Sequence, residues 1–268
     1  MTDKEKLIEI FLNNIKGKSF NVNYSDYIHD GQKGYWLEEQ FGIRHNSKNE
    51  ADLYGYELKS ETSTKTTFGD WSANEYIFNQ LEYNSIFNES SSLGKRDHFL
   101  RLFGKSNILK NGRYSWSGES CPKINEYNKF GQILKVIDNN DIIAEYSYSK
   151  DLRNDKEEIL PPIFQQDNLI LAKWYGDFIP NGKTGKCLRE RVENKFNDKG
   201  WFTCKTNSNG IYDTICFGSP ITFENWINLV KSGIVFFDSG MHETNPRPYS
   251  NWRALNNLWN SLIVEIYS

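Results

Sequence analysis

The chain has 268 residues, of which 38% are hydrophobic and 25% charged, a composition typical of a globular protein and not of a disordered one. No apolar run approaches the ~20 residues that a membrane-spanning helix needs, and the N-terminus lacks the charged-then-apolar pattern of a secretory signal. The net charge of −3 argues against nucleic-acid binding through bulk charge, although a basic lining along a groove would be enough to bind it.

The first part of the chain contains two helical patterns followed by a strand pattern. Apolar residues at helical spacing predict an amphipathic helix over residues 3–16 that a glycine closes. Two glycines bracket a short helix over residues 34–42. Residues 52–59 alternate with period two, which predicts a strand, and residues 72–82 read as another helix.

The second part mixes strands, turns and helices without regular βαβ alternation. Residues 98–150 read as strands and turns, including a hairpin over residues 130–148 that turns at Asn139-Asn140. The charged segment 152–162 ends in two prolines and is a candidate connection between lobes. Beyond it we predict strands at 169–175, 211–217 and 234–237, and helices at 188–196 and 219–233.

Asp52, Glu57 and Lys59 form the pattern D-x-x-x-x-E-x-K in the predicted strand 52–59. Phosphodiester hydrolysis needs carboxylates that hold Mg²⁺ against the scissile phosphate, where the metal neutralises charge and lowers the pKa of the attacking water. A lysine beside the metal can orient that water and stabilise the developing negative charge. The pattern therefore indicates a metal-dependent nuclease.

Strand geometry sets a condition on this interpretation. Side chains alternate along a strand, so Glu57 and Lys59 emerge on one face while Asp52 has the opposite parity. Asp52 must then lie at a bend before the strand, or Gly55 must permit a bulge that brings it round.

The short E-x-K motif also occurs by chance. A second copy, Glu193 and Lys195, lies in a helix-patterned charged segment without a nearby upstream aspartate, and we interpret it as a solvated helix face. The alternative for Glu57 and Lys59 is an exposed pair on the sheet with no catalytic role.

The order and spacing of these residues resemble the PD-(D/E)XK restriction endonucleases. The motif G-x-x-L-E over residues 34–38 and D-x-x-x-x-E-L-K-S over residues 52–60 look most similar to the MvaI/BcnI branch, which is related to the nicking repair enzyme MutH. The resemblance covers roughly residues 30–62, and Ala51 stands where many members have proline.

By position, the resemblance implies that Asp52 and Glu57 are ligands of Mg²⁺ and that Lys59 is the catalytic lysine. It implies that Glu38, on the preceding helix, is a further catalytic carboxylate that supports the site. We expect replacement of Glu57 or Lys59 by alanine to abolish cutting and to spare folding, because both side chains should be partly exposed at a cleft.

The resemblance also implies a mixed α/β fold. Its restriction-endonuclease-like core would hold a central mixed sheet flanked by helices, and a recognition lobe would form a DNA cleft. We place the catalytic lobe at residues 1–155 and the recognition lobe at residues 156–268, with the two lobes intertwined.

A polar loop late in the chain is the candidate DNA-reading element. Within residues 238–253, His242, Arg247, Tyr249 and Arg253 are side chains suited to base edges or phosphates, presented between glycine and prolines. The MvaI branch carries a similar late loop with a histidine and an aromatic-arginine pair.

Part of this loop could have a structural role. Trp252 and Tyr249 could instead be core residues, with Arg247 and Arg253 as surface residues or as members of structural salt bridges. Lys65 follows the active strand in a hydroxyl-rich loop and is a further candidate for phosphate contact.

The expected function is a type II restriction endonuclease that cleaves double-stranded DNA at a short specific site with Mg²⁺. It would act as a monomer or weak dimer, with a cognate DNA methyltransferase as genetic partner, in the cytoplasm, whose reducing conditions suit four widely spaced cysteines. The alternatives are a MutH-like strand-nicking repair enzyme, a DNA-binding protein with an inactive nuclease core, and a carbohydrate-binding protein or glycosidase that uses the abundant aromatic residues.

Overall fold

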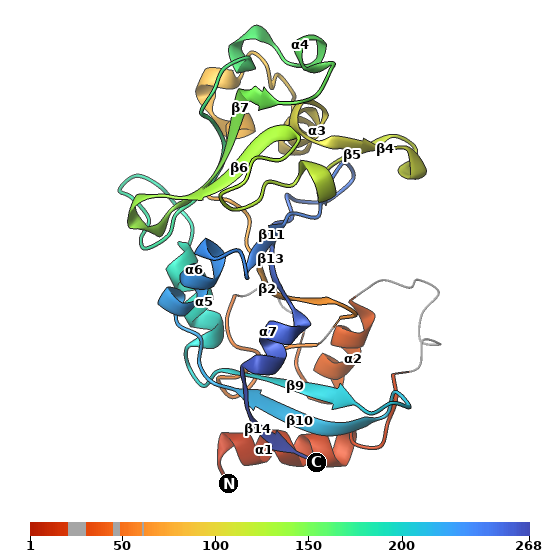
Figure 1. Cartoon of the computed structure of the whole chain (residues 1–268). Helices are drawn as coiled ribbons and strands as arrows, with labels where there is room; N and C mark the ends of the chain where they lie inside the picture. The colour runs from red at the N-terminus through yellow and green to blue at the C-terminus, as the bar shows by residue number, and fades with distance from the viewer. Residues whose placement is uncertain (21–30, 45–48, 61) are drawn as a thin grey trace. The chain divides into compact units, whose positions relative to one another are not determined.

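The computed structural model describes residues 1–20, 31–44, 49–60 and 62–268, and the chain passes repeatedly between two units (Figure 1). Unit 1 comprises Met1–Thr66, Arg191–Asn225 and Ala254–Ser268, and unit 2 comprises Thr67–Glu190 and Trp226–Arg253. The units are therefore interleaved along the sequence. The expected lobe boundary at residue 155, and the whole segment 152–162 expected to connect the lobes, lie inside unit 2.

Unit 1 is built on a four-stranded mixed sheet with the order β1-β9-β10-β14. The strands are β1 (Glu57–Leu58), β9 (Trp201–Thr206), β10 (Tyr212–Gly218) and β14 (Ile263–Tyr267). Strand β1 is parallel to β9, and the other neighbours are antiparallel. The helices of this unit are α1 (Asp3–Asn14), α2 (Gln32–Gln40), α7 (Asn256–Ser261) and the C-terminal part of α5 (Leu188–Phe196).

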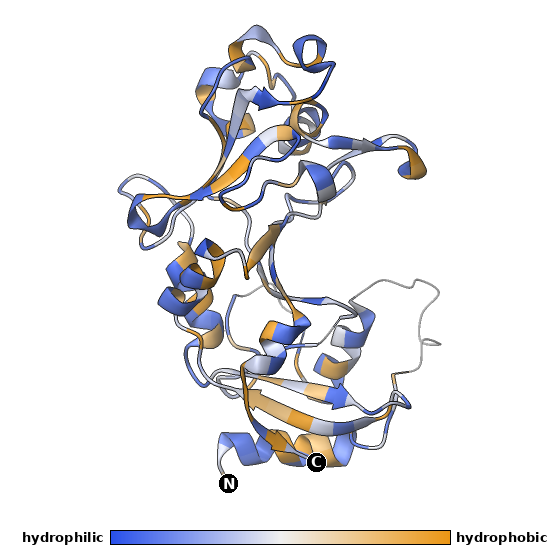
Figure 2. Cartoon of the chain, viewed as in Figure 1, coloured by the Kyte–Doolittle hydropathy of each residue, from blue (hydrophilic) through white to orange (hydrophobic). Residues whose placement is uncertain are grey.

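The two faces of this sheet pack against different helices. Phe202 and Phe217 are register partners on one face, where Phe202 meets Phe41, the residue that follows α2, with 4.9 Å between ring centroids. Trp201 points to the opposite face and meets Trp259 of α7 at 5.0 Å. Hydrophobic residues, orange in Figure 2, follow β9 and β10. The apolar cluster of the first face consists of Leu7, Phe11, Ile15, Leu37, Phe41, Tyr56, Leu58, Phe202, Cys204, Tyr212, Ile215 and Phe217.

Unit 2 contains an antiparallel sheet with the order β3-β8-β7-β6 and a smaller sheet with the order β12-β5-β4. A third sheet, β11-β13-β2, includes strands that continue into unit 1. The strands are β2 (Lys65–Asp70), β3 (Glu75–Tyr76), β4 (Lys105–Asn107), β5 (Arg113–Trp116), β6 (Phe130–Val136), β7 (Ile142–Asp151), β8 (Leu169–Trp174), β11 (Phe236–Asp238), β12 (Met241–His242) and β13 (Asn251–Leu255). The helices are α3 (Ser92–Phe103), α4 (Lys156–Ile159) and α6 (Phe223–Lys231), the last beginning in unit 1.

The predicted elements with clear end signals are confirmed. Helix α1 begins with a capping box between Thr2 and Glu5. The hairpin of β6 and β7 turns at Asn139 and Asn140, both with φ near +55°, the left-handed conformation that asparagine tolerates. The described part of the chain contains no helix that is long and apolar enough to cross a membrane, and all four cysteines are buried free thiols.

Two predictions about local structure are wrong. Residues 72–82 do not form a helix: β3 is followed by two 3-10 turns, Ile77–Asn79 and Leu81–Tyr83, separated by Gln80 in an extended conformation. Helix α3 occupies the beginning of the segment predicted as strands and turns, with Ser91 as its N-cap. Four of its last five residues are buried, so core packing outweighs the weak periodicity.

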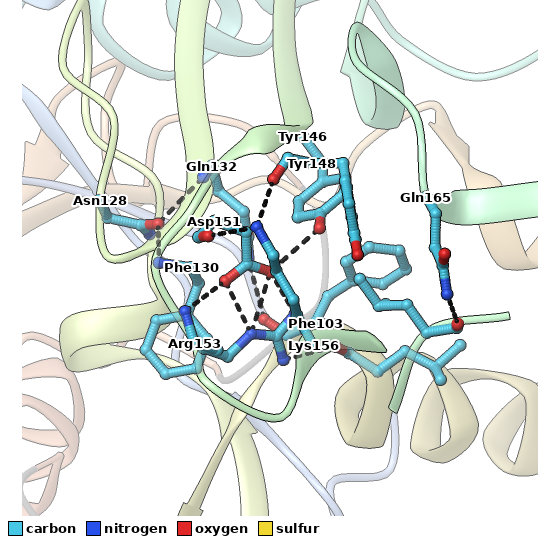
Figure 3. Close-up of polar contacts among 12 residues, drawn as sticks. Phe103, Asn128, Phe130, Gln132, Tyr146, Tyr148, Asp151, Arg153, Lys156 and Gln165 are labelled. Atoms are coloured by element: carbon cyan, nitrogen blue, oxygen red, sulfur yellow. Dashed lines mark hydrogen bonds and ion pairs between the residues drawn. The ribbon is translucent and has the colours of Figure 1, made fainter. Parts of the chain in front are cut away.

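A buried ion pair joins the end of β7 to α3 in unit 2 (Figure 3). Asp151 is 2% exposed, and Arg153 binds its carboxylate through Nε and Nη2 at 2.7–3.1 Å. The Tyr146 hydroxyl donates to Asp151 at 3.0 Å, while Arg153 Nη1 donates to the Leu102 carbonyl at 2.9 Å. The guanidinium lies over the Phe130 ring, 5.2 Å from its centroid, so this pair holds several elements of the unit together.

Candidate active site

A tight turn places Asp52 beside strand β1. Leu53 and Tyr56 exchange two backbone hydrogen bonds of 2.9 and 3.0 Å, and both intervening residues have positive φ, +53° at Tyr54 and +83° at Gly55. This is the geometry of a two-residue hairpin turn. The Leu58 N–H donates to Asp52 Oδ2 at 2.9 Å. The chain therefore bends at Gly55, as the parity of the motif required.

Replacing Gly55 with alanine should lower the free energy of unfolding by about 1–2 kcal/mol, because an L-residue pays that cost in the left-handed region. A Cβ there would also stand 2.1 Å from Asp198 Oδ2, which must move away. Urea unfolding measures the loss, and DNA cleavage should fall with it because the turn positions Asp52. A variant as stable and as active as wild type would contradict this role for the turn.

Glu57 and Lys59 point to the same face of unit 1, which α5 and α7 cover. Glu57 is the register partner of Trp201 and so faces away from the apolar cluster that contains Leu58. Its Oε1 lies 2.8 Å from Lys59 Nζ. The side chains are only 3% and 10% exposed, so the alternative of an exposed surface pair is wrong. The premise that both side chains are partly exposed is wrong as well, so we now expect alanine at either position to destabilise the fold.

A second lysine completes this cluster. Lys195 of α5 lies with its Nζ 2.7 Å from the same Glu57 Oε1, and its side chain is 16% exposed. The interpretation of Glu193 and Lys195 as a solvated helix face is therefore wrong for Lys195. The buried residue Val192 lies three positions earlier on the helix, so helical spacing places Lys195 beside the buried face. That spacing is the signal in the sequence that could have identified it.

The two ammonium groups have different surroundings. Lys59 Nζ lies 5.0 Å from the Phe196 ring centroid and 6.0 Å from that of Trp259. Burial lowers the pKa of Lys59 below its ordinary value, although the Glu57 carboxylate opposes the shift. Burial also acts to lower the pKa of Lys195, but the Glu57 and Asp52 carboxylates outweigh it and raise that pKa above the usual range.

The carboxylates of Asp52 and Glu57 are close enough to interact strongly. Burial, followed by the charge of Glu57, raises the pKa of Asp52 to about 7, while Lys195 and Lys59 act in the opposite direction. Glu38 of α2 also contributes to raising the pKa of Lys195, so its charge acts on the same cluster. The structure thus gathers all four predicted catalytic residues, together with Lys195, in unit 1.

The carboxylates of Asp52 and Glu57 supply some, but not all, of the ligands that a hard divalent cation needs. Among the described residues, no group of three or more His, Cys, Asp and Glu side chains is arranged to hold a metal ion. Mg²⁺, however, is commonly bound through one or two carboxylates plus water and substrate phosphate. Glu57 Oε2 is buried and has no hydrogen-bond partner within the described chain, an arrangement that needs a partner such as a cation. Asp52 and Glu57 therefore fit a Mg²⁺ ion that also binds DNA phosphate.

The predicted DNA-reading residues lie in unit 2. His242 of β12 has both ring nitrogens engaged: Nδ1 with the Glu243 carbonyl, and Nε2 with the Asn245 amide nitrogen at 2.9 Å. Arg113 Nη1 also lies 3.4 Å from Nε2. The imidazole is thus held within its own loop.

The other loop residues divide between surface and core. Arg247 is half exposed, binds Asp70 at 2.5 Å and stacks on Tyr249 with its guanidinium carbon 4.4 Å from the ring centroid. Arg253 pairs with Asp238 at 3.4 Å, and Trp252 is fully buried. The alternative of structural ion pairs and a core tryptophan therefore describes part of this loop.

Lys65 belongs to unit 1, the unit of the acidic pair, and begins β2. The hydroxyl of Thr62 donates to the Lys65 carbonyl, which ties the start of the strand to the preceding loop. The aromatic residues are mostly interior. Six tryptophans are fully buried, at positions 116, 174, 201, 226, 252 and 259, so they form the cores and not a sugar-stacking surface.

Comparisons with known proteins identify the family of this chain. A sequence model of the LlaMI restriction endonuclease family matches residues 15–267. The chain is 58% identical over 267 residues to the type II restriction enzyme ScrFI of Lactococcus lactis subsp. cremoris, covering 99% of this chain and 98% of that enzyme. The solved complex of restriction endonuclease MvaI with its cognate DNA is similar with a TM-score of 0.58 at 13% identity, covering 100% of this chain and 98% of MvaI. The likeness to MvaI confirms the expected restriction-endonuclease-like fold.

Proposed function

Because this chain belongs to the LlaMI restriction endonuclease family and is a type II restriction endonuclease, we propose that it hydrolyses DNA phosphodiester bonds with Mg²⁺ held by Asp52 and Glu57. Type II enzymes are site-specific deoxyribonucleases that generally use a divalent metal ion, and double-stranded DNA is the substrate of this one. The observation that carries the proposal is Glu57: its Oε1 binds two lysines, and its buried Oε2 has no partner among the described residues.

Each residue of the cluster has a role in this proposal. A bound Mg²⁺ supplies neutralisation of the scissile phosphate and a lowered pKa of the attacking water. Lys59 orients that water through its ammonium N–H groups and stabilises negative charge on the phosphate oxygens. Lys195 is a positioning residue, because its bond to Oε1 leaves Oε2 of Glu57 for the metal. Glu38 supports the cluster by balancing the charge of Lys195.

DNA contacts are proposed for the loop of unit 2 and for Lys65. Arg247 is the strongest candidate because it is half exposed and its guanidinium lies over the Tyr249 ring, a group suited to a base edge or a phosphate. His242 and Arg253 would first have to exchange their present partners for DNA. Lys65 would contact the backbone near the cleaved phosphate.

Incubation of the purified protein with plasmid DNA, in Mg²⁺ or in EDTA, tests the function. We expect discrete linear fragments in Mg²⁺ and intact plasmid in EDTA, and sequencing of the fragment ends gives the recognition site. Nicked circles without linear product would instead favour the MutH-like alternative. Fragments formed equally in EDTA would contradict the metal-dependent mechanism.

The biological setting follows from the same activity. An enzyme that cuts DNA at a short site endangers its host's own chromosome, so we propose a cognate DNA methyltransferase that protects that site. We also propose a cytoplasmic monomer or weak dimer. A reducing compartment would keep the four buried thiols free.

A further inference from the structure

The hairpin of β4 and β5 in unit 2 carries two apolar side chains at its tip. Ile108 is 90% exposed and Leu109 is 92% exposed. Figure 2 shows this apolar tip in orange at the end of the hairpin. An exposed isoleucine and leucine side by side gain nothing from the core of unit 2, so the tip offers apolar surface that a binding partner could bury.

The backbone holds this tip in one conformation. Ser106 pairs with Tyr114 across the hairpin, and the Ser106 hydroxyl donates to the Gly112 carbonyl at 3.0 Å. The Gly112 N–H donates to the Asn107 carbonyl at 3.0 Å, and Asn111 and Gly112 both take the positive φ that closes the turn. The apolar pair is therefore presented by a rigid turn, which limits the entropy lost on binding.

The charge of the hairpin favours an anionic partner. Residues 105–113 contain Lys105, Lys110 and Arg113 and no acidic residue. Lys105 pairs with Glu119 at 2.8 Å, but both side chains are about half exposed, so this pair is weak and a phosphate can replace it. A second copy of the chain would bring two such positive tips together, which electrostatic repulsion disfavours.

The hairpin also belongs to the same sheet as the proposed reading loop. Strand β5 lies between β4 and β12, with Ser115 as the register partner of His242. Arg113 reaches His242 Nε2 at 3.4 Å. A duplex that meets the reading loop is thus within the reach of the element that carries the apolar tip.

We propose that the 105–113 hairpin enters a groove of the DNA duplex and places Ile108 and Leu109 against the bases. Two-stranded ribbons fit the major groove, and leucine and isoleucine are side chains that proteins press against or between base pairs. Lys110 contacts a phosphate beside them. The inference rests on the proposed DNA contacts of unit 2 and adds a second reading element to the loop.

The test measures binding of a short duplex carrying one mapped cleavage site, with Ca²⁺ in place of Mg²⁺, over a series of salt concentrations. Replacing Ile108 and Leu109 together with serine should weaken binding about tenfold or more at every salt concentration, with an unchanged salt slope, because the lost contact is apolar. Lys110→Gln should instead reduce the slope of log K against log salt by about 0.9.

Leu81→Ser is the matched control, because Leu81 is 86% exposed elsewhere in unit 2. This variant should bind the duplex with the same affinity as wild type. Wild-type affinity of the Ile108→Ser/Leu109→Ser variant would overturn the inference. A variant that changes oligomeric state but binds DNA normally would also overturn the inference, because it would identify a second copy of the chain as the partner. The plasmid digestion decides the proposed function separately, because the wild type would still cut in either case.

Discussion

Replacing Glu57 with glutamine should abolish DNA cleavage and also destabilise the protein. Glutamine keeps the shape of the side chain but removes the charge that Lys59 and Lys195 share at 2.8 and 2.7 Å. Two buried ammonium groups would then lose the carboxylate that both of them contact, and breaking a buried pair in this way costs about 3–5 kcal/mol. Loss of the proposed metal ligand should reduce the cleavage rate on the order of a thousandfold or more.

A double variant separates the two effects. Glu57→Gln with Lys195→Met removes one charge of each sign, so the free energy of unfolding should recover by at least about 1 kcal/mol over Glu57→Gln alone, while cleavage stays absent. Lys199→Met is the matched control near α5. Lys199 pairs with Asp3 at the surface, so its loss should change the free energy of unfolding far less than Glu57→Gln does. Urea unfolding and single-turnover cleavage measure both quantities. Normal cleavage by Glu57→Gln would disprove the proposed role.

Local sequence rules were sufficient to predict how Asp52, Glu57 and Lys59 are placed relative to one another. Strand alternation places Glu57 and Lys59 on one face, and the glycine at position 55 permits the turn that brings Asp52 to Leu58. The resemblance to the PD-(D/E)XK enzymes added the proposed catalytic roles, and family membership confirms the enzyme class.

Contacts between distant segments could not be predicted in the same way. Helical spacing within α5 indicates that Lys195 borders the buried face, but its contact with Glu57 joins segments far apart in the sequence, which that spacing does not specify. The imidazole of His242 appeared free for base recognition in the sequence, yet Asn245 and the Glu243 backbone bind both of its nitrogens. The interleaving of the two units likewise depends on long-range pairing that composition does not show.

Replacing Arg153 with methionine should destabilise unit 2 by about 3–5 kcal/mol, because it leaves the Asp151 carboxylate buried without its cation. Asp151 has no exposed side-chain surface, and within the described residues only the Tyr146 hydroxyl and the backbone N–H of residue 153 would remain as donors to its carboxylate. The Leu102 carbonyl at the end of α3 would lose its guanidinium partner as well. Because methionine keeps apolar contact with Phe130, the loss of stability would come from the missing guanidinium charge and not from a smaller side chain.

Hydrogen exchange followed by mass spectrometry locates this effect in the molecule. Amides of β6, β7 and α3 should exchange faster in Arg153→Met, and those of β9 and β10 should change less, because the pair lies wholly within unit 2. Arg101→Met is the matched control: Arg101 is 65% exposed and pairs with Glu243 at 3.0 Å, so its loss should cost at most about 1 kcal/mol. If Arg153→Met unfolds at the same urea concentration as Arg101→Met, the buried pair does not stabilise unit 2. If β9 and β10 lose protection as strongly as β7, the two units unfold together, and the ion pair of unit 2 then also supports the carboxylates of the active site.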